Sequence, residues 1–595
     1  MPELPLAIPP AAFLILGAPL LAVLRGWPRK VVQVLVPLLL LGHVITLHGH
    51  DPHFGFEWMG YGVDLLRVDA LRFAFGLIFS IMALIGSIYA LHVDDPLQGP
   101  AAWVYAGGAL GVTFAGDWLA FVLFWELMGF SSAMLVFARR TAASRAAGTR
   151  YMAVHAFGGV LLVMGVILYV HGGGAMAVGR IPLDAGLAGW LMLVGVCINA
   201  AVPPLGPWLP DAYARGTVTG SVFLSAFTTK TAVFALIALF AGWKILLYAG
   251  VVMALYGVVY AVLENDIRRL LAYHIISQVG YMVAGAGMGT AMALDGATAH
   301  AFSHILYKSL LFMGAGSVVY ATGKEKMTEL GGLVRKMPVV LALYAVGAMS
   351  ISGFPLFNGF ISKSIVVSAG GQGGWPWAEL LLTLAAVGTF LHTGLKLLWF
   401  TFVTPLDRPQ EVRPLPKNMY VAMGIGAALC TYFGLPEISS GFGYGTLYRL
   451  LPFGTEYHPY SAAHVGQTLQ LLAGTALAFW WLFDKLWAED TISLDTDWIY
   501  RKPLPPLVMA LSRGLYSAQE RFGRKVGELA ARALRQIESP IREAERTIGR
   551  GMVEEEHPAY RRDPYRVPVG VTVLLVLGVF AGLAVLHLLT RSGLP

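Results

Sequence analysis

Long apolar stretches separated by short polar segments recur along almost the whole chain. A helix needs about 20 mainly apolar residues to cross the hydrocarbon core of a bilayer, so each such stretch predicts a membrane-spanning helix. About sixteen stretches have this length. They begin near Ala11, Val31, Leu65, Ala101, Trp118, Thr149, Leu187, Gly220, Lys244, Arg269, Ala297, Pro338, Leu380, Met419, Ala462 and Val567. The pattern therefore predicts an all-α polytopic membrane protein.

Two of these stretches contain helix-breaking residues near their middle. Pro203 and Pro204 interrupt one, and Gly353 and Pro355 interrupt the other. Proline removes a backbone donor and clashes with the preceding turn, so both helices are expected to break within the membrane. Transporters use broken helices in repeated bundles to build ion sites, and the spacing of the breaks suggests two five-helix repeats. Ordinary kinks, which are common in membrane helices, are the alternative.

The chain changes character after its closely spaced apolar stretches. From Leu504 to Val553 it is rich in charged residues, and its apolar residues follow a nearly helical period. This pattern predicts a long amphipathic helix, which would either cover neighbouring membrane subunits or lie on anionic lipid. The expected order is N-terminal transmembrane helices in 1–100, a first five-helix repeat in 101–243, a second in 244–404, additional transmembrane helices in 405–490, the amphipathic helix in 491–566 and a final transmembrane helix in 567–595.

Composition and charge agree with a membrane protein, since 56% of the residues are hydrophobic and only 13% are charged. The net charge of +7 does not indicate nucleic-acid binding, because Lys and Arg lie in short loops rather than on one face. Basic loops alternate with loops poor in Lys and Arg, which predicts a plasma (inner) membrane protein with the basic loops in the cytoplasm and both termini outside. The two cysteines, Cys197 and Cys430, lie in apolar stretches, so neither a Cys-rich metal site nor a redox cofactor is expected.

Ionisable residues inside the apolar stretches are the candidate functional residues. A charge in the hydrocarbon core costs roughly 3 kcal/mol or more, so such residues need partners or a water-filled path. The row consists of Glu126, Lys230, His274, His300, His304, Lys308, Lys363, His392 and Lys396. It indicates a route for protons or cations. A hydrogen bond between packed helices explains the isolated His155 and His274 equally well.

The spacing of several residues in this row places them on one face of a helix. His300, His304 and Lys308 follow one another at every fourth position and therefore lie along one face of a helix. Histidine and a lysine near other cations can both exchange protons near neutral pH, so the stripe favours a relay. His392 and Lys396 repeat the spacing, with snorkelling of Lys396 toward the surface as the alternative.

Several longer motifs resemble a known family. WLPDAY (208–213), RRLLAYHIISQVGYM (268–282), HAFSHILYKSLLFMGAGSV (300–318) and GFPLFNGFISK (353–363) are similar to the antiporter-like subunits of respiratory complex I and of Mrp-type multisubunit sodium/proton antiporters. The similarity runs from about Leu65 to Thr404. The resemblance implies fourteen core helices with two inverted five-helix repeats, a C-terminal lateral helix and ion translocation.

The resemblance also implies roles for single residues. Glu126 in FWELMGFSS matches the family's fifth-helix glutamate, with a structural carboxylate capped by serines as the alternative. Lys230, Lys308 and Lys363 match the family's lysines on the eighth helix, on the eleventh helix and beyond the second break. Asn199 departs from the family, in which lysine usually occupies this position of the broken seventh helix. We therefore expect Lys230 to form a switchable pair with Glu126.

These observations predict a subunit that translocates protons, with sodium exchange left open, within a multisubunit membrane complex. The complex would be an assembly related to NADH-quinone oxidoreductase or to Mrp antiporters. The chain itself is not expected to be catalytic or to hold a metal or cofactor. A stand-alone solute transporter is one alternative and would need a solute pocket at the broken helices. A non-pumping scaffold of a redox or inorganic-carbon-uptake complex is another, which Asn199 favours.

Overall fold

The computed structural model describes residues 7–58, 60–406, 410–439, 441–487, 489 and 495–548, in two compact units, Met1–Pro503 and Leu504–Pro595. The first part of the chain forms α1 (Pro10–Val23), α2 (Gly26–Thr46), β1 (Phe54–Trp58), β2 (Tyr61–Leu66), α3 (Ala70–Tyr89), α4 (Gln98–Phe114), α5 (Trp118–Phe137), α6 (Ala142–His171), α7 (Gly186–Asn199), α8 (Trp208–Arg215), α9 (Val218–Ala226) and α10 (Thr228–Phe240). It continues with α11 (Lys244–Leu263), α12 (Ile267–Met288), α13 (Ala291–Thr322), η1 (Met327–Glu329), α14 (Pro338–Ser352), α15 (Asn358–Gln372), α16 (Pro376–Thr389), η2 (Phe390–Lys396), η3 (Trp399–Val403), α17 (Lys417–Tyr432), α18 (Tyr444–Tyr448), α19 (Ala462–Trp481), η4 (Phe483–Lys485) and α20 (Asp497–Arg501). The second unit contains α21 (Leu504–Ile548).

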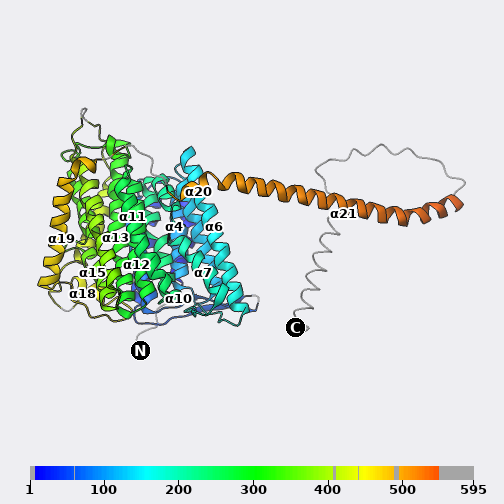
Figure 1. The fold of residues 1–595 in the computed structure, drawn as a ribbon, viewed down its shortest axis with the longest axis horizontal. Coiled ribbons are helices and arrows are strands. Elements are labelled where there is room, and N and C mark those ends of the chain that lie inside the picture. The colour runs from blue at the N-terminus through cyan, green and yellow to red at the C-terminus, as the bar shows by residue number, and fades with distance from the viewer. Residues whose placement is uncertain are drawn as a thin grey trace. The chain divides into compact units, whose positions relative to one another are not determined.

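The helices of the first unit stand side by side, with α19 at one edge and α6 and α7 at the other (Figure 1). Within the part of the chain that the structure describes, eight helical segments are long and apolar enough to cross a membrane. They are Gly26–Thr46, Ala70–Tyr89, Trp118–Phe137, Ala142–His171, Val218–Phe240, Lys244–Leu263, Ala291–Thr322 and Pro376–Val403, and α1, α7 and α14 are shorter apolar helices. The chain is thus a mainly helical, multi-pass membrane protein. The count of sixteen spans and the inverted repeats stay predictions, and the final span from Val567 lies outside the described residues.

One element departs from the all-α expectation. Strands β1 and β2 pair as an antiparallel hairpin between α2 and α3, whereas the apolar pattern predicts only helices. Gly60 in the connection has φ +81°, a conformation that glycine adopts without steric cost. The prediction was wrong here because a two-stranded hairpin is too short to produce a strong alternating pattern.

Both predicted helix breaks are confirmed. The first separates α7, which ends at Asn199, from α8, which begins at Trp208. The second separates α14 from α15, and Gly353 follows the last residue of α14 with φ +76°. Proline and glycine therefore end both helices for the expected reason.

Two further irregularities of the helices are not predicted by the residue pattern. A third break separates α9 from α10 at Phe227, without proline or glycine nearby. Here the backbone N–H of Thr228 donates to the hydroxyl of Tyr105, at 2.8 Å. In addition, the stretch after α16 continues as π-helix in η2 and η3 rather than as the regular helix that was expected. π-Helical turns of this kind occur often at functional sites.

The centre of the first unit is formed by α10, α12 and α13, whose side chains are almost all buried. Small residues bring neighbouring backbones together here. A Cβ added at Gly280 of α12 would lie 2.6 Å from the backbone nitrogen of Ala254 in α11. A helix that is buried all round has no lipid-facing side, so its polar residues must face other helices.

Candidate functional site

Nearly all the predicted ionisable residues lie buried in the first unit. Those that expose 6% of their surface or less are Lys230, His274, His300, His304, Lys308, Lys363, His392 and Lys396. Glu126 is half-buried. Polar side chains at such depth are normally paired or hydrated, so their surroundings decide what they can do.

Most of these side chains lie near enough to one another to interact electrostatically, and we call this series the base chain. Its members, each interacting with the next, are Lys230, His304, Lys308, His274, His392, Lys396 and Glu264. Lys363 interacts from α15 with His304, His274 and His392. The base chain runs through neighbouring helices, because α10 packs against α12 and α13, these two pack against each other, and Thr393 of η2 contacts His274 of α12. Figure 1 shows α10, α12 and α13 in the same bundle.

Three lysines donate to carbonyl groups in the last turns of helices. Lys230 donates to the carbonyl of Ser225 in α9, at 2.6 Å, and Lys363 to that of Ile351 in α14, at 2.8 Å. Lys396 donates to the carbonyl of Val262 near the end of α11. The last carbonyls of a helix lack partners within the helix and carry its partial negative charge. Each helix end therefore provides a site for a lysine cation, and at Lys396 the carboxylate of Glu264 adds to it.

Two histidines of the base chain are bridged by one hydroxyl. The rings of His274 and His392 lie 4.6 Å apart and perpendicular to each other. The hydroxyl of Thr393 lies 2.8 Å from Nδ1 of both rings. A hydroxyl can donate to one ring and accept from the other, so this arrangement connects the two histidines by hydrogen bonds.

Other atoms of the base chain are buried without a hydrogen-bond partner. These are both ring nitrogens of His304, Nζ of Lys308 and Nε2 of His392. Leaving a buried polar group unpaired costs about 1–3 kcal/mol. Such atoms mark positions where water molecules would bind.

A polar cavity of about 170 Å³ adjoins Lys363. It extends from the second helix break to the first turns of α16 and α19. Its polar and charged lining consists of Ser352, Lys363, Ser364, Ser368, Glu379, Thr383, His464, Gln467 and Thr468. This volume can hold several water molecules.

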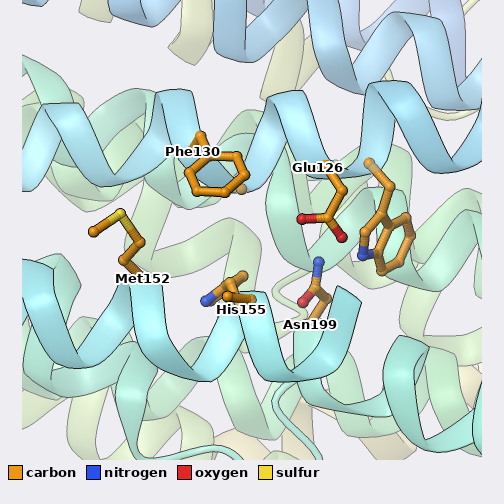
Figure 2. Close-up of a pocket in the computed structure, with 8 residues that line it drawn as sticks. Glu126, Phe130, Met152, His155 and Asn199 are labelled. Carbon is orange, nitrogen blue, oxygen red and sulfur yellow. The ribbon is translucent and has the colours of Figure 1, made fainter. Parts of the chain in front are cut away.

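Glu126 lies in a different pocket, formed by α5, α6 and α7. Its lining residues are Trp125, Glu126, Gly129, Phe130, Met152, His155, Ala156 and Asn199. Figure 2 shows the carboxylate of Glu126 facing the side-chain amide of Asn199, with His155 beside them. Helix α6 approaches closely because residue 159 is glycine, and a Cβ there would overlap Oε1 of Glu126.

The expected pair of Glu126 with Lys230 is not formed. Among the described residues no ion pair joins the two, and Nζ of Lys230 donates to Ser225 and to Oγ1 of Thr229. The physical reason is the break after α9, which offers Lys230 a free carbonyl only five residues away. Glu126 instead shares its pocket with Asn199 and His155.

Charged residues in the loops surround one face of the site. Burial alone would raise the pKa of Glu325, but Arg268 and Arg139 hold it below its usual value. Burial raises the pKa of Glu264, at the end of α11, to about 7, although Arg269 lies 3.4 Å away and opposes this shift. The last member of the base chain can therefore change its charge near neutral pH.

Sequence reasoning missed Glu379, His464 and Thr393. Glu379 and His464 lie at the starts of apolar stretches, where polar residues are ordinary, and a threonine within a helix gives no signal. The sequence favours a packing role for His155 as much as a functional one, and only the fold places it beside Glu126.

Comparisons with known proteins agree with this architecture. Residues 115–390 match the family described as NADH:quinone oxidoreductase/Mrp antiporter, transmembrane. An uncharacterised protein of Methanocaldococcus jannaschii is 30% identical over 355 residues, which cover 56% of this chain and 73% of that protein. Hydrogenase-4 component B of Escherichia coli is 28% identical over 417 residues, which cover 62% of each protein. In a solved structure of the membrane-bound sulfane sulfur reductase, an archaeal respiratory membrane complex, one chain matches 97% of this chain with a TM-score of 0.68 and 22% identity.

Proposed function

Because the chain belongs to the membrane-subunit family of NADH:quinone oxidoreductases and Mrp antiporters, we propose that it is a proton-translocating subunit of a multisubunit membrane complex. The observation that carries this proposal is the base chain, a continuous series of buried titratable side chains. Its members lie on neighbouring helices, and a polar cavity adjoins it at Lys363. Such a series is costly in a membrane protein and is typical of proton relays.

The two ends of this path have different surroundings. Glu264 lies in the short loop between α11 and α12, and Arg268 and Arg269 lie in the first turn of α12. We assign this end of the two helices to the cytoplasm. The cavity at Lys363 reaches the first turns of α16 and α19, which we assign to the outside. Protons enter at Glu264, pass along the base chain to the histidines that interact with Lys363, and leave through Lys363 and the cavity. The unpartnered atoms of His304 and Lys308 are where water completes the path.

The lysines act as switches within this path. A lysine that donates to a helix end is stabilised as a cation, by about 0.3–1 kcal/mol for an exposed site and up to about 2 kcal/mol when partly buried. Two unit charges about 8 Å apart interact by roughly 2 kcal/mol at an effective dielectric constant near 20. These energies are similar to the cost of moving one proton across about 100 mV, roughly 2.3 kcal/mol. The charge on one lysine can therefore control protonation of the next.

Replacing Lys363 by arginine tests the proposal. Arginine keeps the positive charge and the donors that reach Ile351, but it does not release a proton in proteins. We expect the complete complex carrying Lys363→Arg to assemble normally and to lose proton flux about tenfold or more in reconstituted vesicles. Lys244→Arg, at the exposed start of α11, is the matched control and should leave the flux unchanged. Full flux with Lys363→Arg would mean that Lys363 is only a fixed charge and would contradict this path.

A second candidate, a scaffold that does not pump, is favoured by Asn199. This residue provides no titratable group in the pocket of Glu126, where the family usually has a lysine. A scaffold predicts that neither Lys363→Arg nor Glu126→Gln changes proton flux by the complete complex. Transport of an organic solute is less well supported, because the cavity at the second break is smaller than the roughly 300–1,000 Å³ of typical small-molecule pockets.

The partners, ion and energy source follow from the same proposal. The partners are other membrane subunits, and the driving reaction belongs to an oxidoreductase or to a cation gradient supplied by the assembly. Protons are the ion that the histidines and lysines can carry, while sodium exchange would show as sodium-dependent proton flux in the same vesicles.

A further inference from the structure

The pocket of Glu126 contains three buried polar atoms that have no hydrogen-bond partner. They are Nε1 of Trp125, Nε2 of His155 and Oδ1 of Asn199, whose residues expose 2%, 5% and 1% of their surface. The pocket leaves a space of about 10 Å³, about the smallest that takes one water molecule. A buried polar cavity with several unpaired groups is the kind of site in which an ordered water is found.

The hydrogen bonds of His155 determine which of its nitrogens can take a proton. Nδ1 lies 2.9 Å from the backbone carbonyl of Tyr151. A carbonyl only accepts, so Nδ1 must carry the hydrogen. In the neutral ring Nε2 is then unprotonated and offers its lone pair to the cavity.

The ring of His155 is also held in place by its neighbours. It stacks on the ring of Tyr151 with the centroids 3.9 Å apart, and its edge packs against Trp208 of α8 at 4.4 Å. Among the residues lining the pocket, Glu126 is the only other titratable one, and Asn199 faces it from α7. The pocket therefore offers the imidazole one acidic neighbour, and the packed rings leave it little freedom to turn away.

We propose that a single water molecule in this cavity connects Glu126 to His155 and that the two residues exchange a proton through it. The proton leaves the carboxyl group of Glu126 for the water oxygen, while a hydrogen of the same water passes to Nε2 of His155. The water is regenerated, Glu126 becomes a carboxylate and His155 becomes an imidazolium. The indole N–H of Trp125 donates to the water, and Oδ1 of Asn199 accepts from it.

This exchange gives Glu126 a titratable partner, which Asn199 cannot be. It moves a proton from α5 to α6 without changing the net charge of the pocket, and the attraction between the two charges offsets part of the cost of burying them. His155 then serves as the base of the pocket, and the first part of the molecule keeps a switchable charge pair that includes Glu126 but not Lys230. The inference rests on the proposed proton-translocating function and adds to it the acceptor for Glu126.

The test compares His155→Gln with His171→Gln in the complete complex. Glutamine keeps a polar side chain at position 155 but cannot be protonated, and His171 is the exposed last residue of the same helix. Infrared difference spectroscopy would follow the carboxyl band of protonated Glu126, identified by its loss in Glu126→Gln. We expect His155→Gln to shift this band and to lower proton flux about tenfold or more, and we expect His171→Gln to do neither.

An unshifted band or full flux in His155→Gln overturns the inference. If that variant does not assemble, Trp125→Phe removes only the indole donor, and an unshifted Glu126 band in it overturns the inference as well. Lys363→Arg separates the role of His155 from the proposed function. Loss of flux in Lys363→Arg together with full flux in His155→Gln would reject only the role of His155, whereas full flux in both would reject the proposed function.

Discussion

At the scale of single residues, two lysines of the site are held by backbone rather than by carboxylates. Lys230 and Lys363 each donate to a carbonyl that a helix break leaves free. A carboxylate partner would bind a lysine tightly and resist its deprotonation, whereas a helix end offers only a partial charge. This arrangement keeps both lysines able to gain and lose a proton during turnover.

Gly159→Ala should disturb the site without disturbing the fold. A methyl group at this position would overlap the carboxylate of Glu126, which is the flexible end of a side chain and can move aside. We expect nearly unchanged thermal stability and a clear loss of proton flux by the complete complex, because the carboxylate leaves its position near His155. Gly129→Ala is the matched control, since its Cβ would lie 3.8 Å from the nearest side-chain atom in the same pocket. Equal flux in the two variants would show that the position of the Glu126 carboxylate does not matter.

Most of the candidate site could be predicted from the sequence, but its pairings could not. A titratable residue inside an apolar stretch is visible without a structure, and Lys230, His304, Lys308 and Lys363 were found in this way. Which atoms face one another depends on the rotation of each helix and on breaks far away in the chain. The pairing of Glu126 with Lys230 was therefore predicted wrongly, because a backbone acceptor leaves no trace in the residue pattern.

At the scale of elements, the helix breaks caused by a residue's own backbone chemistry were predicted. The break caused by a contact between two helices was not. Pro203, Pro204 and Gly353 act through their own backbone chemistry and end a helix wherever they occur. The break at Phe227 depends on Tyr105, which lies on another helix and accepts the N–H of Thr228. A tertiary contact between residues more than a hundred positions apart cannot be read from a local pattern.

Tyr105→Phe should weaken this third break. Phenylalanine keeps the ring but removes the hydroxyl of Tyr105. That hydroxyl accepts the backbone N–H of Thr228 and lies 2.6 Å from the side-chain hydroxyl of Thr228. Leaving this buried donor unpaired should cost about 1–3 kcal/mol of stability. Because Lys230 lies in the first turn of α10, proton flux should fall as well. Thermal unfolding and flux of the complete complex measure both effects, with Tyr248→Phe, a mostly exposed tyrosine, as control. Wild-type values for Tyr105→Phe would mean that other contacts maintain the break.

At the scale of the whole molecule, the chain divides at Pro503 into a membrane unit and a helical unit. The general fold of the first unit followed from apolar stretches, and the amphipathic period predicted α21. The segment before the division is tied to the membrane unit. Tyr273 donates to Asp495 at 2.6 Å, and Arg501 pairs with Asp211 at 2.8 Å. These contacts could not be predicted, since they join parts of the chain more than 200 residues apart.

The exposed apolar side chains of α21 lead to the last prediction. Leu507, Leu511 and Leu515 expose 64% or more of their surface. Exposed apolar rows of this kind mark contacts with other proteins or with membranes, and membership of the family favours neighbouring membrane subunits. A chain that stops after Pro503 keeps the anchors at Asp495 and Arg501. We therefore expect it to retain the thermal stability of the membrane unit but to lose co-purification with the other subunits.

The full-length chain with Leu507, Leu511 and Leu515 changed to glutamine is the matched variant for this prediction. It keeps the length and charge of α21 and removes only part of its apolar row, so it should lose the same partners if side-chain burial holds the assembly together. Normal co-purification of both variants would instead assign α21 to the lipid surface.

Proton flux by the purified single chain gives the complementary measurement. A subunit whose path is completed by its neighbours should show little flux alone, and robust cation-dependent proton exchange by the isolated chain would identify a self-contained antiporter.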